Sequence, residues 1–366
     1  MSSRLLEANQ QQVAGAADAS QRARLLQDRA ILQARLGRTD DARQTLDRAE
    51  EAAPADLPAT LKLRFAYARA IAAYFGKHFD QARQQMATVL QQARGHGDAS
   101  LAAECESTLA LFLQREGDVR AAARHARAVL AGPECSLESR YRASLALASL
   151  HQDARDYEEA VRLYRETQDV VRSLGDDIAM ASWMGRAAAS QAAHARQAAA
   201  SGDLDTRTLK EAVDALERSI AFSEQLPDAP DVALNRLLLA EMRVLQKQYR
   251  EALALYDAQL PAIEGDGFLH EVTAAMADRA HCLLKLGEPD AAYSQAAAAL
   301  QRLDESTPAD IRAIVHENMA EALQQARKTI EAEQHRVLSR MAWETYAHEQ
   351  REARRLLREN PTETLH

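Results

Sequence analysis

The chain has 366 residues, a formal net charge of -9, 27% charged residues and only 5% aromatic residues. The acidic balance argues against nucleic acid as the main partner, because neutralising phosphates needs clustered Lys and Arg, and no stretch supplies such a cluster. With 13 Gly and 9 Pro the sequence is poor in turn-forming residues, which favours a nearly all-helical chain with short turns.

The sequence also carries expectations about the environment of the protein. Residues 1–10 lack the apolar core of a signal peptide, and no window is apolar enough for a membrane span. The three cysteines are odd in number, far apart and in no metal-binding spacing: Cys105, Cys135 and Cys282. They indicate reduced thiols rather than disulfides, so we expect a cytoplasmic protein without a cofactor.

An alanine pair repeats along the chain. Ala30 and Ala42 stand twelve residues apart with Gly37 between them, and this spacing returns with a period near forty. The further pairs are Ala70/Ala82, Ala110/Ala122, Ala148/Ala160, Ala188/Ala212 with extra residues between, Ala240/Ala252, Ala280/Ala292 and, weakly, Ala320/Ala332. A methyl group at a helix crossing lets two axes approach closely. Each pair therefore predicts two packed helices joined by a turn, with a residue such as Gly37 at positive φ.

Two stretches carry a family resemblance. Asp156-Tyr-Glu-Glu-Ala160-Val-Arg-Leu-Tyr164 and Tyr249-Arg-Glu-Ala252-Leu-Ala-Leu-Tyr256 resemble the second helix of a tetratricopeptide repeat, and Leu286-Gly287 resembles the end of its first helix. The resemblance covers residues 20–305 with units of about forty residues rather than the usual 34, as in many bacterial members. It implies an all-α, right-handed superhelical solenoid of about seven antiparallel helix pairs whose first helices line the concave face.

The chain divides into three expected segments. Residues 1–19 are polar and read as a poorly ordered lead-in, 20–306 as the solenoid, and 307–360 as a long C-terminal helical cap. Thr307-Pro308-Ala309-Asp310 combines an N-cap, a proline in the first turn and an acid, which marks a firm helix start. No Gly or Pro follows until near the end, so the cap is one helix or two with an unmarked turn near Arg327-Lys328, and we favour one.

One unit is irregular. Ala188 and Ala212 are separated by twelve residues more than the other pairs, and the added residues are strongly helix-forming. The first helix of this unit is therefore expected to overshoot its neighbours by up to about 18 Å. Its tip would carry His194, Arg196 and Gln197 with little apolar surface. We interpret it either as a contact for a partner or second subunit, or as a tolerated insertion without a role.

Catalytic motifs are not evident. Each of three His-Glu pairs, at residues 270, 316 and 348, lacks the second histidine four residues later that a zinc protease helix requires. Gly265-Asp-Gly267 lacks the lysine of a phosphate loop and follows an expected helix, so it indicates a turn. We therefore expect no catalytic residues, no metal site and no enzymatic activity.

The first helices are expected to present a binding groove for a protein or peptide. The residues predicted to face it are Arg24, Ile31, Arg64, Tyr67, Ile71, Tyr74, Leu111, Arg115 and Arg142. They would offer an apolar and aromatic floor with arginines along it, suited to apolar anchors and acidic flanks. The alternative is that the aliphatic side chains pack between neighbouring first helices and the arginines are solvated.

Three functions remain open at this point. The main expectation is a non-enzymatic, protein- or peptide-binding solenoid that acts as a cytoplasmic adaptor or regulatory protein, without nucleic acid or membrane insertion. The second is a scaffold that associates with copies of itself. The third is a degenerate signalling protein, because bacterial solenoids of this kind can lead through a long helix into a diguanylate cyclase domain. This sequence contains no such domain, so that activity is not carried over.

Overall fold

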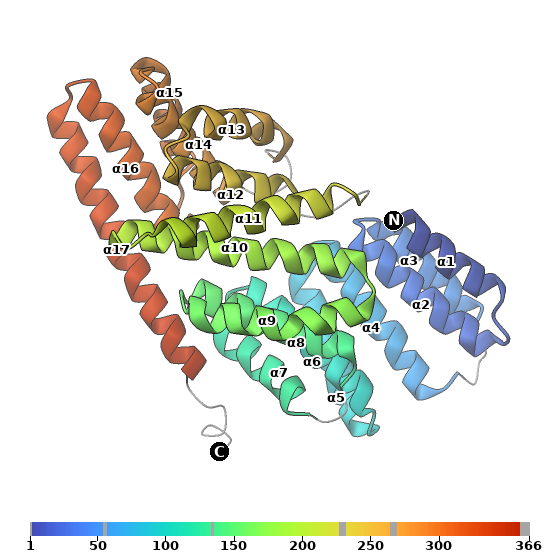
Figure 1. The fold of residues 1–366 in the computed structure, drawn as a ribbon. Coiled ribbons are helices and arrows are strands. Elements are labelled where there is room, and N and C mark those ends of the chain that lie inside the picture. The colour runs from blue at the N-terminus through green and yellow to red at the C-terminus, as the bar shows by residue number, and fades with distance from the viewer. Residues whose placement is uncertain (1, 54–56, 133–134, 227–231, 264–268, 359–366) are drawn as a thin grey trace.

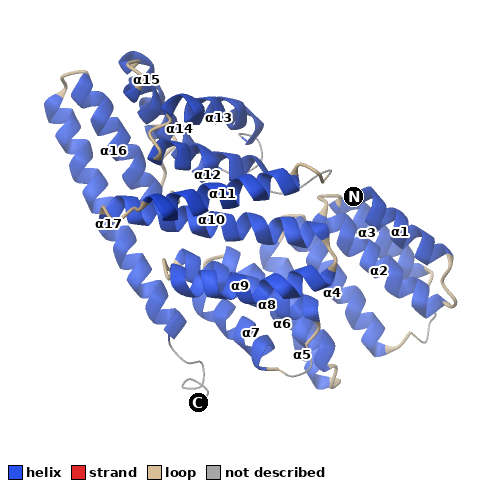
Figure 2. Ribbon diagram, in the orientation of Figure 1, coloured by secondary structure: helices blue, strands red, loops and turns tan. Residues whose placement is uncertain are grey.

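The computed structural model describes residues 2–53, 57–132, 135–226, 232–263 and 269–358 (Figure 1). Within these ranges the chain forms seventeen helices. Figure 2 shows helices and loops but no strand in the described part of the chain. No helix in them combines the length and apolarity needed to cross a membrane. The all-α class predicted from the sequence is confirmed.

The helices follow one another with short connections. They are α1 (Ser2–Ala14), α2 (Ala19–Arg35), α3 (Thr39–Glu51), α4 (Ala59–Phe75), α5 (Phe79–Gly95), α6 (Ala99–Arg115), α7 (Val119–Ala131), α8 (Leu137–Asp153), α9 (Tyr157–Leu174), α10 (Asp177–Ser201), α11 (Thr206–Ser223), α12 (Val232–Leu245), α13 (Tyr249–Ile263), α14 (Leu269–Lys285), α15 (Pro289–Leu300), α16 (Ala309–Gln325) and α17 (Thr329–Arg358).

The helices after α1 pack as consecutive pairs. Each first helix contacts its own second helix, and most first helices also contact the first helix of the next pair, as α2 contacts α3 and α4. Every alanine of the repeating pairs is at most 2% exposed. The steric reason inferred from the sequence, a methyl group at each helix crossing, is therefore confirmed.

The turns within the pairs share one backbone feature. Gly37, Gly117 and Gly287 have positive φ, as their position seven residues after the first alanine predicts. The equivalent positions without glycine adopt the same conformation: Lys77, Arg155, Lys247 and Arg327, with φ between 55° and 65°. The repeat geometry thus imposes the left-handed turn even where the residue disfavours it.

The C-terminal segment is a helix pair rather than the single long helix favoured from the sequence. α16 ends at Gln325 and α17 begins at Thr329, with Arg327 at φ 61° between them. The break lies at the alternative position considered, near Arg327-Lys328. Its cause is the repeat itself, because Ala320 and Ala332 form the last buried alanine pair and place a turn between them.

The N-terminal residues are also more ordered than expected. Instead of a poorly ordered lead-in, α1 packs against α2. Leu6 and Asn9 are buried, and the Asn9 side-chain amide donates a hydrogen bond to the Leu25 carbonyl at 2.9 Å. The few residues that α1 buries lie one turn apart and so share one face, which is enough to dock the helix.

The long α17 returns to the front half of the molecule (Figure 1). Leu357 is buried in the same core as α7 and α8. The Arg354 guanidinium donates hydrogen bonds to the carbonyls of Ala154 and Arg155, both at 2.6 Å. The Arg155 guanidinium in turn lies 4.0 Å from the centroid of the Tyr346 ring. The last helix therefore ties the end of the solenoid to the α8–α9 turn.

Candidate functional site

Four consecutive first helices, α2, α4, α6 and α8, enclose a pocket on their inner face. Its volume is about 250 Å³. The lining residues are Gln27, Asp28, Ile31, Leu32, Arg35, Arg64, Tyr67, Glu104, Glu138 and Arg142. We call this cavity the front pocket. Its walls are mostly charged, and its aliphatic lining comes from Ile31 and Leu32 of α2.

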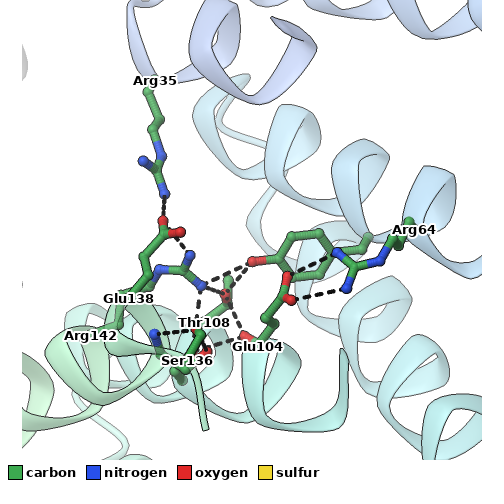
Figure 3. A network of polar contacts seen from close by, with 10 residues as sticks. Arg35, Arg64, Glu104, Thr108, Ser136, Glu138 and Arg142 are labelled. Carbon is green, nitrogen blue, oxygen red and sulfur yellow. Dashed lines mark hydrogen bonds and ion pairs between the residues drawn. The ribbon is translucent and has the colours of Figure 1, made fainter. Parts of the chain in front are cut away.

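Arg142 is the centre of the polar network beside the front pocket (Figure 3). Its side chain is only 10% exposed. The guanidinium donates hydrogen bonds to the hydroxyls of Tyr67 at 3.0 Å and Thr108 at 3.3 Å, and it pairs with Glu138 on the preceding turn of α8. One buried cation thus connects α4, α6 and α8 and fixes their spacing.

Glu138 is shared by two arginines. One of its oxygens, Oε1, accepts a hydrogen bond from Arg35 at 2.9 Å and also pairs with Arg142. Burial alone would raise the pKa of Glu138, but the two guanidinium groups outweigh burial and lower the pKa to about 2. Glu138 is therefore ionised at neutral pH, and it ties α2 to α8.

The second ion pair of the network joins α4 to α6. Both terminal nitrogens of Arg64 reach the carboxylate of Glu104, at 3.2 and 3.5 Å. The hydroxyl of Thr108 donates to the Glu104 backbone carbonyl at 2.8 Å, and it lies 3.0 Å from the Tyr67 hydroxyl. Burial raises the pKa of Tyr67, so this hydroxyl stays protonated. The side chains on this wall of the pocket hold one another in place.

Asp28 differs from these groups. Its carboxylate lines the front pocket but makes no hydrogen bond or ion pair in the part of the chain that the structure describes. Burial against neighbouring groups raises the pKa of Asp28, and the negative charges of Glu104 and Glu138 add to the rise against the attraction of Arg64. Asp28 is an exposed residue, so its carboxylate at the pocket is open to solvent and has no protein partner, with two other acids nearby.

The structure brings together only part of the predicted groove. Ile31, Arg64, Tyr67 and Arg142 line the front pocket. The remaining predicted residues are placed differently: Ile71 and Tyr74 are buried, Leu111 is half-buried, and Arg24 and Arg115 are exposed. Tyr74 stacks on Phe112 with ring centroids 3.8 Å apart, so it belongs to the core and not to the floor of a groove.

Asp28 and Glu138 are among the lining residues that sequence reasoning missed. Asp28 stands two residues before the first alanine of its unit, a position not included among those predicted to face inward. Its spacing to Ile31, Leu32 and Arg35 is three, four and seven residues, which places all four on one side of α2. That spacing is a signal that could have identified Asp28. Glu138 lies in the first turn of α8, far from the alanine, and had no such signal.

The irregular unit does not form a free-standing tip. α10 has 25 residues against 17 in α8, so it is longer by 8 residues, or about 12 Å. His194 stacks on Tyr157 with centroids 5.5 Å apart, and Arg196 pairs with Glu241 at 3.0 Å. Gln197 lines a cavity of about 260 Å³ shared with the end of α17. The expected protrusion with little apolar surface is therefore packed within the fold.

A second inner-face carboxyl lies in the rear half of the chain. Asp278 on α14 accepts a long hydrogen bond, 3.4 Å, from the buried Tyr256 hydroxyl. Burial is the main cause that raises the pKa of Asp278 to about 7, and the nearby charge of Glu241 adds to it. Arg196 and His281 oppose the rise. Asp278 is enclosed by protein groups on neighbouring helices.

Two histidines lie side by side on α16 and α17. Nδ1 of His316 lies 3.0 Å from Nδ1 of His335 across the α16–α17 pair. Burial, with His335 and Arg312 beside it, lowers the pKa of His316 to about 4. A stable site would need further ligands, and within the described ranges no three His, Cys, Asp or Glu side chains gather around one point.

Solved structures with this fold match most of the chain. A Rap protein complexed with Competence and Sporulation Factor aligns with a TM-score of 0.56 and 15% identity, covering 90% of this chain and 87% of that one. NprR in complex with its cognate peptide NprX aligns with a TM-score of 0.57 and 13% identity, covering 81% of this chain and 82% of that one. The apo form of the quorum sensor NprR from B. thuringiensis aligns with a TM-score of 0.55 and 13% identity, covering 93% of each chain.

Sequence comparisons add no closer relative. No family model matches the chain, and no curated protein matches it. Identities below 25% show a shared fold and nothing finer. The chain therefore has a tetratricopeptide-type helical solenoid fold, as its repeated alanine pairs indicated, and it is similar in fold to Rap and NprR proteins.

Proposed function

We propose that the protein is a cytoplasmic, non-enzymatic regulatory or adaptor solenoid that binds a peptide, or a peptide segment of a partner protein, in the front pocket. One observation carries the proposal. Four consecutive first helices leave a cavity of about 250 Å³ in which the unpartnered Asp28 lies beside arginines fixed by the protein. A cavity of this size suits one or two side chains of a peptide rather than a whole cofactor.

The fixed walls favour binding. Arg142 and Glu138 are locked by contacts from α2, α4 and α6, so their side chains lose little freedom when a ligand arrives. The apolar strip of Ile31 and Leu32 offers a surface for a peptide side chain. Two similar folds, the Rap protein and NprR, were solved with Competence and Sporulation Factor and with the peptide NprX, which supports the same use here.

The chemistry of the pocket supports a binding role over catalysis. Its charged lining is mostly engaged in ion pairs, and none of its lining residues pairs a nucleophile with a general base. Cys105 and Cys282 are buried free thiols, which fits a reducing compartment. These observations support the non-enzymatic and cytoplasmic parts of the proposal.

A peptide-display selection tests the proposal. The full-length protein would be used to select from a library of random heptapeptides, and a selected peptide would then be added during hydrogen exchange. We expect slower exchange at the inner turns of α2, α4, α6 and α8, with the rear helices unchanged. A library that yields no enriched peptide, or protection confined to other helices, would contradict the proposal.

We infer self-association through α17 as the second candidate function. Ile330, Val337, Leu338 and Met341 are exposed by 80%, 41%, 43% and 58% of their surface. Their spacing of seven, eight and eleven residues places them on one side of α17, opposite the buried Ala332, Ser339 and Ala342. α17 lies at the edge of the molecule (Figure 1), where it contacts α16, α7 and α8.

The stripe fits a second copy of the same chain. Glu333 and Arg340 border it on one side, and the middle of the stripe lies between them. Glu333 pairs with Arg340 on α17 at 3.3 Å, and in an antiparallel dimer with two-fold symmetry this pair would be exchanged, with Glu333 of one copy facing Arg340 of the other, twice. Light scattering at several concentrations would test it: a dimer that Met341→Glu dissociates supports this function, and a concentration-independent monomer contradicts it.

A further inference from the structure

We propose that the front pocket selects a peptide segment of mixed charge, with a cationic group held at Asp28, an anionic group held at Arg35, and an apolar side chain between them on Ile31 and Leu32. The inference rests on the proposed function, since it names the ligand chemistry of the same pocket. It follows from which charged groups of the pocket are already paired and which are not.

The negative end of the pocket is Asp28. Arg64 is engaged by Glu104 through both of its terminal nitrogens and forms no ion pair with Asp28, although its charge attracts this carboxylate. Both carboxylate oxygens of Asp28 lack a hydrogen-bond donor in the described chain. Glu104 and Glu138 add to the negative potential around it. The group that this corner binds best is a cation, namely an ammonium or guanidinium.

The positive end is formed by Arg35 and Arg142. These two guanidinium groups share a single carboxylate, that of Glu138, and even a single oxygen of it. Nε of the buried Arg142 has no hydrogen-bond partner, so donors outnumber acceptors at this end. Arg35 is 37% exposed and uses only one nitrogen, which leaves donors free to bind a carboxylate of a ligand.

The spacing of the two ends defines the ligand further. Asp28 and Arg35 are seven residues apart on α2, which corresponds to about 10 Å along the helix. In a polyproline-II segment, residues three apart lie on the same side at about 9 Å. Ile31 and Leu32 occupy the helical turn between the two charged residues and are half-buried. The matching peptide therefore carries its two charges three residues apart, with an apolar residue between them.

Peptide selection with charge-changed variants tests this inference. The wild-type chain, Asp28→Lys and Asp169→Lys would each select from the same heptapeptide library. Asp169 lies on α9 with its side chain 90% exposed, away from the pocket, so it is the matched control. Wild type and control should enrich a basic and an acidic residue three apart, whereas Asp28→Lys should lose the basic residue.

Affinity measurements complete the test. A peptide selected by the wild type should bind Asp28→Lys and Asp28→Asn at least tenfold more weakly, and Asp169→Lys with unchanged affinity. If Asp28→Lys misfolds, Asp28→Asn, which keeps the shape of the side chain, decides the result. Acetylating only the N-terminal amine of the peptide separates the sources of the cation. Loss of binding identifies the terminal amine, and retained binding identifies a lysine or arginine side chain.

The outcomes separate this inference from the proposed function. Enriched peptides without the paired charges, or equal affinities for wild type and both Asp28 variants, would overturn the mixed-charge ligand while peptide binding stands. A library that gives no enriched peptide with any of the three proteins would contradict peptide binding itself.

Discussion

Asp28 and Asp278 occupy the same place in their repeats, two residues before the first alanine, yet their surroundings differ. Burial raises the pKa of both carboxyls. In the rear half, Asp278 accepts a hydrogen bond from Tyr256. In the front half, Asp28 lines an open pocket and has no partner among the described residues. The same inner-face position is thus used for packing in one half and is available to a ligand in the other.

The difference shows how a repeat acquires a site. In unit three the equivalent residue is Thr108, which satisfies its hydroxyl on the backbone carbonyl of Glu104. The Thr108 hydroxyl also lies 3.0 Å from the Tyr67 hydroxyl on α4, so it is satisfied by protein groups. An inner-face position is left without a protein partner when its neighbours are paired with one another, as Arg64 is with Glu104 beside Asp28.

The largest expected effect tests the rigid wall of the front pocket. Arg142→Ala removes a buried cation from Glu138 and Tyr67, and we expect a loss of about 3 kcal/mol in the free energy of unfolding. Arg64→Ala breaks a partly exposed pair and should lose less than about 1 kcal/mol. Urea unfolding of both variants measures this. Equal losses in the free energy of unfolding would mean that Arg142 stabilises this wall of the pocket no more than Arg64 does.

The second prediction concerns what the two halves share. Ala148→Leu in the front half and Ala240→Leu in the rear half should each destabilise the fold by roughly 1 to 3 kcal/mol, because both alanines are fully buried at helix crossings. Ala17→Leu, at an exposed position before α2, is the control and should change little. Urea midpoints that do not differ between the three variants would show that the crossings tolerate larger side chains.

The third prediction separates the two aspartates by pH. The folded pKa of Asp278 is about 7, and the unfolded pKa is about 4. Between about pH 4 and pH 7 the folded chain keeps a proton on Asp278 that the unfolded chain has lost. The free energy of unfolding therefore falls as the pH rises through this range. Asp278→Asn should therefore raise stability at pH 8, on the order of 1 kcal/mol, and change little at pH 4.

Asp28→Asn is the matched comparison for that measurement. Asp28 lies at the edge of an open pocket, so its replacement should alter peptide binding far more than the thermal midpoint. Asp278→Asn should alter the thermal midpoint far more than peptide binding. Thermal melts of both variants at pH 5 and pH 8 provide the data, and a stability gain at pH 8 that is as large for Asp28→Asn would remove the distinction between the two sites.

The smallest expected effect concerns the turns. Arg327→Gly places glycine where φ is positive and should stabilise the α16–α17 pair by about 0.5 to 1 kcal/mol. Gly287→Ala at the equivalent turn, with open space around it, should destabilise by a similar amount because only the backbone conformation is strained. Chemical unfolding of the two variants shows whether the shifts have opposite signs.

The fold could be predicted because it follows from a local steric rule. The alanine pairs are buried in every unit, including the weak pair Ala320 and Ala332 that we had not used to divide the C-terminal segment. The turn at Arg327 was only the less favoured alternative to a single helix, because no glycine marks it. The docking of α17 was also unpredictable, because Arg354 binds backbone carbonyls that any sequence at residues 154 and 155 would offer.

The candidate site was predicted only in part, for a physical reason. The helical period identified Ile31, Arg64, Tyr67 and Arg142 as inward-facing. It could not show which arginines would be neutralised, because the partners Glu104 and Glu138 lie 40 and 103 residues along the chain from Arg64 and Arg35. Whether a charged side chain is free or paired depends on such distant contacts.

The central claim is that the front pocket is the peptide-binding site, and filling the pocket without changing its charge tests it most directly. Ile31→Trp would occupy the apolar strip of α2, and Leu269→Trp, at an exposed position of α14, is the control. Calorimetric titration with one selected peptide is predicted to show at least tenfold weaker binding to folded Ile31→Trp, a loss of about 1.4 kcal/mol, and unchanged binding to Leu269→Trp. Equal affinity of Ile31→Trp and the wild type would contradict the claim.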